Sequence, residues 1–486
     1  MMGTHQPQEN LFDYYVNLDK RVRPNHPLRR ISEMIDFTFV RERVARCYGY
    51  NGNISVDPAV IMKMMFLLFY DDVASERELM WIIGERLDYM WFLGYGLNDK
   101  VPDHSVLSKA RSRWGLEVFE ELFIRIVGQC VKAGLVDGTK IHMDGCLVDA
   151  NASNNSVVKG PPELIQALKK AYRREEDKLE EKKRPPLGRP YYKPVNKGLF
   201  STTDPDAAVV RRQKECARPR YKNHRVVDDA QGVITAIETT PGDVEENRKL
   251  LDLVDQHERN TRIKAETVVT DRQYGTTDNF RNCNQRGIRS HMGDLKASQA
   301  GKGRRAGIFP EDAFTYDAAS DTYRCPAGQI LKRRKHKAKR KSYEYSAGTK
   351  VCRECRLRSQ CTRSEKSART IKRHENHEDI QAARAQSHSA AGKRDRKKRK
   401  WLMEGSFADA ANNHGLKRAR WRRLRNQRIQ DYLIATIQNI RTLINNLDHN
   451  RKAVAMQAVC IKDKLHNKIL VLFRLAHSDR ACFCHI

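Results

Sequence analysis

Three acidic residues that lie far apart in the chain could act together on a phosphodiester: Asp144, Asp271 and Glu404. Asp144 lies in a short run of alternating apolar residues, and Asp271 ends a β-branched run, so both are predicted on strands. Glu404 follows a basic, helix-prone stretch. Carboxylates that converge from two strands and a helix can bind two divalent ions about 4 Å apart, which activate an attacking oxygen and stabilise a leaving oxygen.

Other carboxylates compete for this role, because the chain has 60 Asp and Glu residues and most such charges are solvated at the surface. Asp149 is five residues from Asp144, so on a continuous strand it would point to the opposite face. Asp228 lies in a predicted hairpin and could be near the site. We rank both residues below the three main acids.

Sequence blocks surround these acids: DGCLVDANA at 144–152, STTDPDA at 201–207, YKNH at 221–224, VVTDRQYG at 268–275, EGSFADA at 404–410 and NHGL at 413–416. In this order and spacing, from about residue 20 to about residue 445, the chain resembles the DDE-class transposases of bacterial insertion sequences. The resemblance implies a ribonuclease-H-like catalytic core. It also implies that Asp144 bridges two Mg²⁺ or Mn²⁺ ions, while Asp271 and Glu404 hold one each.

The activity implied by the resemblance is DNA cleavage at insertion-sequence ends, followed by attack of the freed 3′ hydroxyl on target DNA. The implied partners are the terminal inverted repeats and target DNA, with a homodimer forming on DNA. Two departures from the family pattern, Gln273 and Ala411, leave an inactive copy open. The alternatives are therefore a DNA-binding protein derived from a transposase and a metal-dependent DNA nuclease.

The predicted elements follow the order that a ribonuclease-H-like core requires. They are a strand over 140–145, a hairpin over 224–240, a helix from Asp243 to about 257, a strand ending at Asp271, a helix over 277–286 and a strand over 288–292. We predict an α/β fold: a ribonuclease-H-like mixed sheet core with an N-terminal all-helical domain and a Cys-rich, basic insertion.

The chain is predicted to divide into five parts. They are a helical domain at 1–125, the first part of the core at 136–299 with a charged insertion at 161–200, a Cys-rich basic insertion at 300–370, the last part of the core at 371–450 and a tail at 451–486. The helical domain is either a packing unit or a helix-turn-helix-type reader of DNA ends.

The charge balance favours a polyanionic partner. The chain has 91 Lys and Arg, a formal charge of +31 and a pI near 9.8, and neutralising phosphates releases condensed counterions. A non-catalytic nucleic-acid-binding protein would show the same surplus. Basic residues crowd around Glu404, and those we expect to hold DNA are Lys398, Arg399, Lys400, Lys417, Arg418 and Arg420.

The expected location of the protein bears on the chemical state of its cysteines. The first 20 residues lack a signal-peptide pattern, and the longest apolar run, over 64–70, is too short to span a bilayer. We expect a cytoplasmic, nucleoid-associated protein without membrane contact, whose cysteines are reduced or metal-bound.

Four of the cysteines could form a structural Zn²⁺ site, since a two-residue gap lets two thiolates share one ion: Cys325, Cys352, Cys355 and Cys361. The alternative is four unligated thiols.

Overall fold

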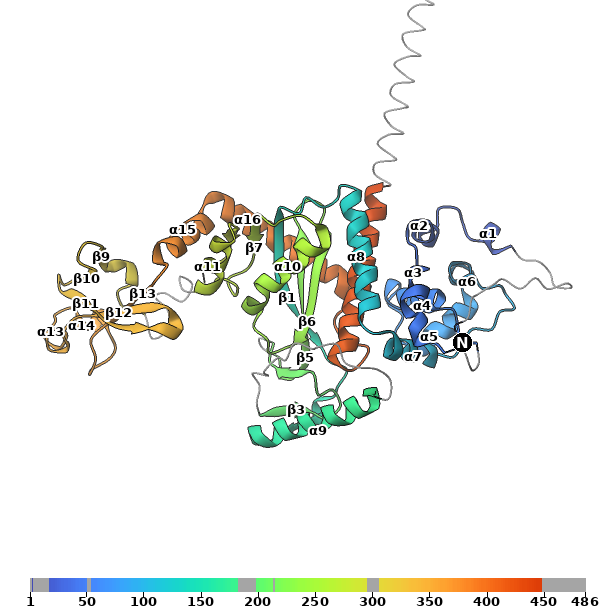
Figure 1. The fold of residues 1–486 in the computed structure, drawn as a ribbon, viewed down its shortest axis with the longest axis horizontal. Helices are drawn as coiled ribbons and strands as arrows, with labels where there is room; N and C mark the ends of the chain where they lie inside the picture. Colours follow the sequence, from blue (N-terminus) through green and yellow to red (C-terminus); the bar gives the residue numbers. More distant parts are fainter. Residues whose placement is uncertain are drawn as a thin grey trace, which may run out of the picture.

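The computed structural model describes residues 2, 17–49, 54–181, 198–212, 215–294 and 306–447. The predicted tail at 451–486 lies outside these residues, as do parts of the 161–200 and 300–370 insertions. Figure 1 shows a central sheet with the N-terminal helices on one side and the later insertion at the far end. No helix in the described part of the chain is long and apolar enough to cross a membrane.

The central sheet has the strand order β6-β5-β1-β7-β8, with β4 pairing another stretch of β5. β1, β5 and β6 are antiparallel neighbours, whereas β7 and β8 run parallel to β1. This is the ribonuclease-H-like arrangement, and the predicted fold class is confirmed. The strands are β1 Lys140–Asp149, β4 Ala208–Val210, β5 Arg218–Asp228, β6 Ile234–Pro241, β7 Thr267–Val269 and β8 Arg289–His291.

Alternation along the strands separates two hydrophobic cores. Val226 of β5 and Ala236 of β6 belong to one core, and their neighbours Val227 and Ile237 belong to the other. Successive side chains of a strand point to opposite faces of the sheet, so a single hairpin serves both cores. The first core is covered by α10 Leu250–Thr261, α11 Thr277–Gln285 and α15 His377–His388.

The N-terminal helices pack into the second core together with a last helix over residues 424–447. Phe69 lies against Trp421, and Phe123 lies against Tyr432. The helices are α1 Leu18–Arg21, α2 Pro27–Met34, α3 Phe39–Val44, α4 Pro58–Tyr70, α5 Glu76–Glu85, α6 Leu87–Leu93, α7 Ser105–Trp114 and α8 Glu117–Lys132. The helix α8 crosses the boundary that we predicted at residue 125, and it covers the sheet beside the last helix (Figure 1).

Local sequence explains where these helices begin. Asp57 accepts a hydrogen bond from the Ala59 N–H at the start of α4, and Pro58 occupies the first turn. Ser75 accepts from the Glu78 N–H at 3.1 Å and so begins α5. These side chains satisfy backbone donors that have no partner within the helix.

Two insertions interrupt the core. The first contains β2 Val157–Lys159, α9 Pro162–Glu181 and β3 Leu199–Ser201. The second is an antiparallel sheet of order β13-β12-β11-β10-β9, and β13 extends beyond the predicted boundary at residue 370. Its elements are β9 Thr315–Asp317, β10 Thr322–Arg324, β11 Ile330–Lys337, β12 Ser342–Ser346, α13 Thr349–Arg353, α14 Arg358–Cys361 and β13 Thr370–His374.

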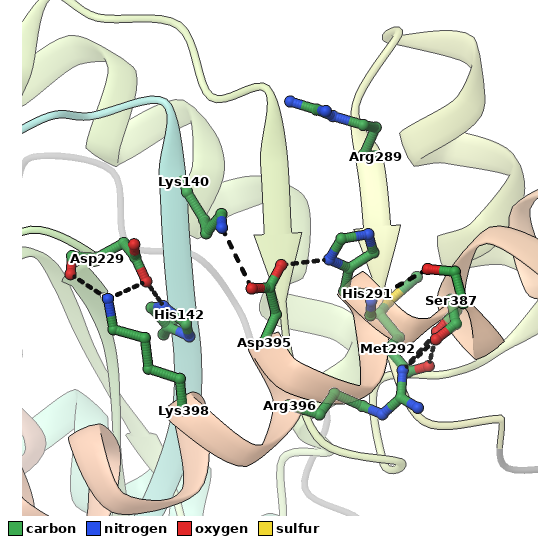
Figure 2. A network of polar contacts seen from close by, with 12 residues as sticks. Lys140, His142, Asp229, Arg289, His291, Met292, Ser387, Asp395, Arg396 and Lys398 are labelled. Carbon is green, nitrogen blue, oxygen red and sulfur yellow. Dashed lines mark hydrogen bonds and ion pairs between the residues drawn. The ribbon is translucent and has the colours of Figure 1, made fainter.

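A polar network holds the helix α16 Ala390–Asn413 against strands β1 and β8 of the central sheet (Figure 2). Asp395 accepts from Lys140 Nζ of β1 at 3.2 Å and lies 2.6 Å from His291 Nδ1 of β8. One carboxylate therefore spans the strands on both sides of β7. One turn later, Lys398 pairs with Asp229 at 2.8 Å, so the basic face of α16 has a fixed position against the sheet.

Candidate active site

The parallel pairing of β1 and β7 places Asp144 and Asp271 side by side. The register of β1 and β7 places Ile141 opposite Val268 and His142 opposite Val269. Two residues further along each chain stand Asp144 and Asp271. Both residues thus lie beside each other where β7 ends, as expected for carboxylates at the same edge of parallel strands.

A third acid completes the group, and it is Glu246. One carboxylate oxygen from each of Asp144, Glu246 and Asp271 lies within 4.8 Å of the other two. This is the only such trio of ligand atoms among the residues that the structure describes. Glu246 opens the 3-10 turn η3 Glu246–Lys249 that follows β6. The helix predicted from Asp243 therefore begins later, with this turn leading into α10.

Gly145 makes room for Glu246. A Cβ atom at Gly145 would stand 3.0 Å from Cγ, Cδ and Oε1 of Glu246, closer than nearly all such contacts. The Gly145 N–H also donates to Asp144 Oδ1 at 2.9 Å. The glycine after the first aspartate thus allows the third carboxylate to approach it, and this Asp-Gly pair is the signal that the sequence offered.

The charges around the three acids are unevenly compensated. Burial raises the pKa of Glu246 to about 7, Lys222 at 3.4 Å opposes that rise, and Asp144 and Asp271 add to it. Burial also raises the pKa of Asp144, although the Arg399 guanidinium opposes it with a 2.7 Å ion pair. Carboxylates that repel one another in a half-buried position hold a divalent cation well.

Tyr274 supplies an unpaired polar atom beside this group. Its side chain is fully buried, and its hydroxyl has no hydrogen-bond partner in the described structure. Burial raises the Tyr274 pKa, and the negative charges of Glu246, Asp144 and Asp271 raise it further. Buried hydroxyls are normally hydrogen-bonded, so an unpaired one next to three carboxylates points to a ligand or water bound there.

Glu404 lies outside this group. It is exposed on α16, one residue after the buried Met403, whereas Arg399 on the same helix turns toward Asp144. The structure thus brings Asp144 and Asp271 together as predicted, and it places Glu246 with them. No described contact joins Glu404 to either aspartate.

The two lower-ranked acids have other partners. Asp149, at the end of β1, pairs with Arg220 at 2.6 Å and Arg218 at 3.6 Å. Asp228 accepts backbone N–H groups of Gly138 at 2.7 Å and Ala230 at 2.9 Å. Both carboxylates therefore hold the ends of strands.

The six basic residues predicted to hold DNA fall into two sets. Lys400, Lys417 and Arg418 are exposed, whereas the remaining three form ion pairs: Lys398 with Asp229, Arg399 with Asp144 and Arg420 with Asp72. The chain at Lys417 and Arg418 runs beside the end of β1, since the Asp149 N–H donates to the Lys417 carbonyl at 3.1 Å. Lys417 and Arg418 are thus exposed beside the end of the strand that carries Asp144, and Lys417 Nζ donates to Asn412 Oδ1 at 3.1 Å.

The four clustered cysteines lie together in the second insertion, where all of them line one cavity of about 30 Å³. Burial raises the pKa of the Cys352 and Cys361 thiols, and the neighbouring thiols raise it further. No three of the sulfurs lie mutually within 4.8 Å, since the acidic trio is the only group of that kind among the described residues.

Comparisons with known proteins give two family matches. The family described as "Transposase domain (DUF772)" matches residues 16–113, and the family described as "Transposase DDE domain" matches residues 324–444. The second match contains Glu404, whereas Asp144, Glu246 and Asp271 precede it.

No curated protein matches the chain. Among solved structures, "Mos1 transposase paired-end complex with left transposon end" is similar at 11% identity with a TM-score of 0.16. That similarity covers 52% of this chain and 64% of the Mos1 chain, so less than two thirds of that relative is matched. The fold assignment rests on the strand order and not on this similarity.

Proposed function

We propose that this chain, which belongs to the DDE-class transposases, cleaves DNA at the ends of an insertion sequence and joins those ends to target DNA. The observation that carries the proposal is the convergence of Asp144, Glu246 and Asp271, whose oxygens lie within 4.8 Å of one another. The DNA substrate follows from the family and from the +31 charge of the chain.

The donor set fits a hard divalent cation. Three carboxylate oxygens and no sulfur or imidazole form the group, and such ligands favour Mg²⁺ or Mn²⁺. The unpaired Tyr274 hydroxyl is a further polar atom beside it. When bound, the metal lowers the barrier that phosphodiester charge presents to an attacking oxygen.

The protein's own groups provide position and charge. Asp144 is held by the Gly145 N–H and by Arg399, so its oxygens have a fixed direction. Lys222 balances part of the negative charge of Glu246. The exposed Lys400, Lys417 and Arg418 would hold the DNA backbone, which positions a phosphate without reading its sequence.

We assign the third ligand to Glu246 on geometry, while the family motif assigns that role to Glu404. The two assignments predict different outcomes for Glu246→Gln and Glu404→Gln, which nearly preserve shape and remove charge. If Glu246 is the ligand, Glu246→Gln reduces both Mn²⁺ binding and cleavage, and Glu404→Gln leaves Mn²⁺ binding unchanged. The reverse pattern would restore Glu404 to the metal site.

The proposed reaction is tested with DNA that carries the inverted repeats flanking the gene. We expect cleavage at the repeat ends and strand-transfer products, both dependent on Mg²⁺ or Mn²⁺ and both lost in Asp144→Asn and Asp271→Asn. Cleavage without joining would identify a nuclease. Specific binding without cleavage in either metal would identify an inactive DNA-binding derivative.

A further inference from the structure

We propose that the second insertion, residues 306–374, carries a closed structural zinc site made by Cys325, Cys352, Cys355 and Cys361. Cys325, Cys352 and Cys361 pack against a small hydrophobic cluster that is separate from the clusters of the central sheet. The site is therefore independent of the carboxylate group and of the reaction proposed there.

The first proposed ligand, Cys325, lies in a turn whose backbone contacts its carbonyl and its sulfur. Cys325 follows β10, and its carbonyl accepts the Gly328 N–H at 2.8 Å, with Gly328 in the left-handed region at φ 79°. The Gln329 N–H then donates to Cys325 Sγ at 3.3 Å. These two bonds fix the position of the Cys325 sulfur.

The other three ligands come from α13, from the turn after it and from α14, and arginines hydrogen-bond to the backbone of the two helices. Cys352 lies in α13 and Cys355 follows it after the two-residue gap typical of zinc sites. Arg358 donates to the Cys352 carbonyl at 2.7 Å, and Arg369 donates to the Cys361 carbonyl at 2.9 Å. These hydrogen bonds fix the backbone carbonyls of Cys352 and Cys361.

The cavity that the four cysteines line offers sulfur donors for a metal. Its remaining lining is mainly apolar, for example Phe309, Leu331 and Val351, and it contains no Asp, Glu or His. An all-sulfur donor set selects Zn²⁺ over Mg²⁺ or Mn²⁺. Because zinc–sulfur bonds are about 2.3 Å long, binding draws the sulfurs closer together than they lie here, through rotation of the cysteine side chains.

The second insertion has a small hydrophobic core, so a bound metal would add to its stability. The buried hydrophobic side chains of the insertion are few: Phe314, Tyr323, Leu331, Tyr345, Ala347 and Ile371. A unit of roughly 70 residues rarely gains enough stability from such a core alone. A structural metal supplies free energy of folding directly, so the five-stranded sheet would depend on zinc for its stability.

The test is elemental analysis of the full-length protein purified under reducing conditions, followed by exchange with Co²⁺. We expect about one zinc per chain and, with cobalt, intense thiolate-to-metal charge-transfer absorption typical of a tetrahedral all-sulfur site. Cys352→Ser/Cys355→Ser should lose both signals. Cys216→Ser, which changes an exposed cysteine outside the insertion, and Asp144→Asn should keep both.

Less than half an equivalent of zinc together with no thiolate–cobalt absorption in the wild type would overturn the site. Zinc retained in full by the double variant, or iron in place of zinc, would overturn it too. If the double variant fails to fold, the cobalt spectrum of the wild type alone reports whether four thiolates bind the metal.

Discussion

Arg399 of α16 donates a hydrogen bond from Nη1 to Oδ2 of Asp144 on β1 at 2.7 Å. This contact places a positive charge next to the carboxylate group and joins the late basic helix to the first strand of the core. Both partners are largely buried, with 13% and 24% of their side chains exposed. Under the proposed function, Arg399 would therefore compete with a cation for Asp144.

Removing this charge should affect metal and DNA in opposite directions. We expect Arg399→Gln to tighten Mn²⁺ binding by roughly tenfold, about 1.4 kcal/mol, because one nearby repulsion of the cation is lost. DNA cleavage should fall, since Asp144 loses the partner that fixes the direction of its oxygens. Calorimetric Mn²⁺ titration and a cleavage assay measure the two effects, and Arg394→Gln, an exposed position on the same helix, is the control. Weaker Mn²⁺ binding in Arg399→Gln would contradict the competition.

Metal affinity should depend on pH through Glu246. Its pKa of about 7 lies above the ordinary value because of burial, so below that pH a proton must leave before the carboxylate binds metal. We expect Mn²⁺ affinity to rise as pH increases through about 7. In metal-free protein the same raised pKa stabilises the fold below the ordinary Glu pKa, and this contribution is lost as pH rises through about 7.

The matched variant for this pH effect is Glu246→Gln, which should bind Mn²⁺ weakly and without the step near pH 7. Titrations on both sides of that pH, for both proteins, measure it. If the Mn²⁺ affinity of Glu246→Gln still rises in the same way near pH 7, the proton belongs to another group.

Gly145→Ala should disturb the third carboxylate with little change to the strand. The added methyl group would meet Glu246 at 3.0 Å, so the side chain must move away from Asp144. We expect Mn²⁺ affinity to fall roughly tenfold, about 1.4 kcal/mol. Gly128→Ala on α8, where nothing lies within 4 Å of the new atom, should leave affinity unchanged. Equal affinity in both variants would mean that Glu246 does not contribute.

The sequence places Asp144 and Asp271 at the ends of two strands, and the parallel pairing of those strands brings the two residues together. The resemblance to DDE-class transposases implied the fold class, and the order of the predicted strands and helices agrees with it. Glu246 was missed because it lies in a 3-10 turn, which has no apolar period to reveal it. Its place depends on the close approach that Gly145 permits.

The orientation of α16 could not be predicted from the sequence, for a different reason. Its basic, polar sequence predicts a helix, but the side that faces the sheet is decided by contacts of Asp395, Lys398 and Arg399 with strands far away in the chain. Those pairings leave Glu404 exposed. A helix with charges on every side carries no amphipathic pattern from which this could be read.

Exposed basic residues near the end of β1 should determine the salt dependence of DNA binding. We expect Lys417→Gln/Arg418→Gln to weaken binding to all sequences alike and to reduce the slope of log affinity against log salt by about 2, one for each lost phosphate contact. The control is Lys132→Gln/Lys264→Gln, two exposed lysines that precede β1 and β7. An unchanged slope in the first variant would mean that this surface faces away from DNA.

The central claim is that Asp144 and Asp271 act as one unit, and a double-mutant cycle on metal-dependent DNA cleavage tests it most directly. Groups that act together lose nearly the whole effect when either is removed. We predict that Asp144→Asn, Asp271→Asn and the double variant all reduce cleavage at the repeat ends to the same background, while binding to the same DNA is retained. Near-wild-type cleavage in either single variant, or effects that simply add in the double variant, would contradict the shared site.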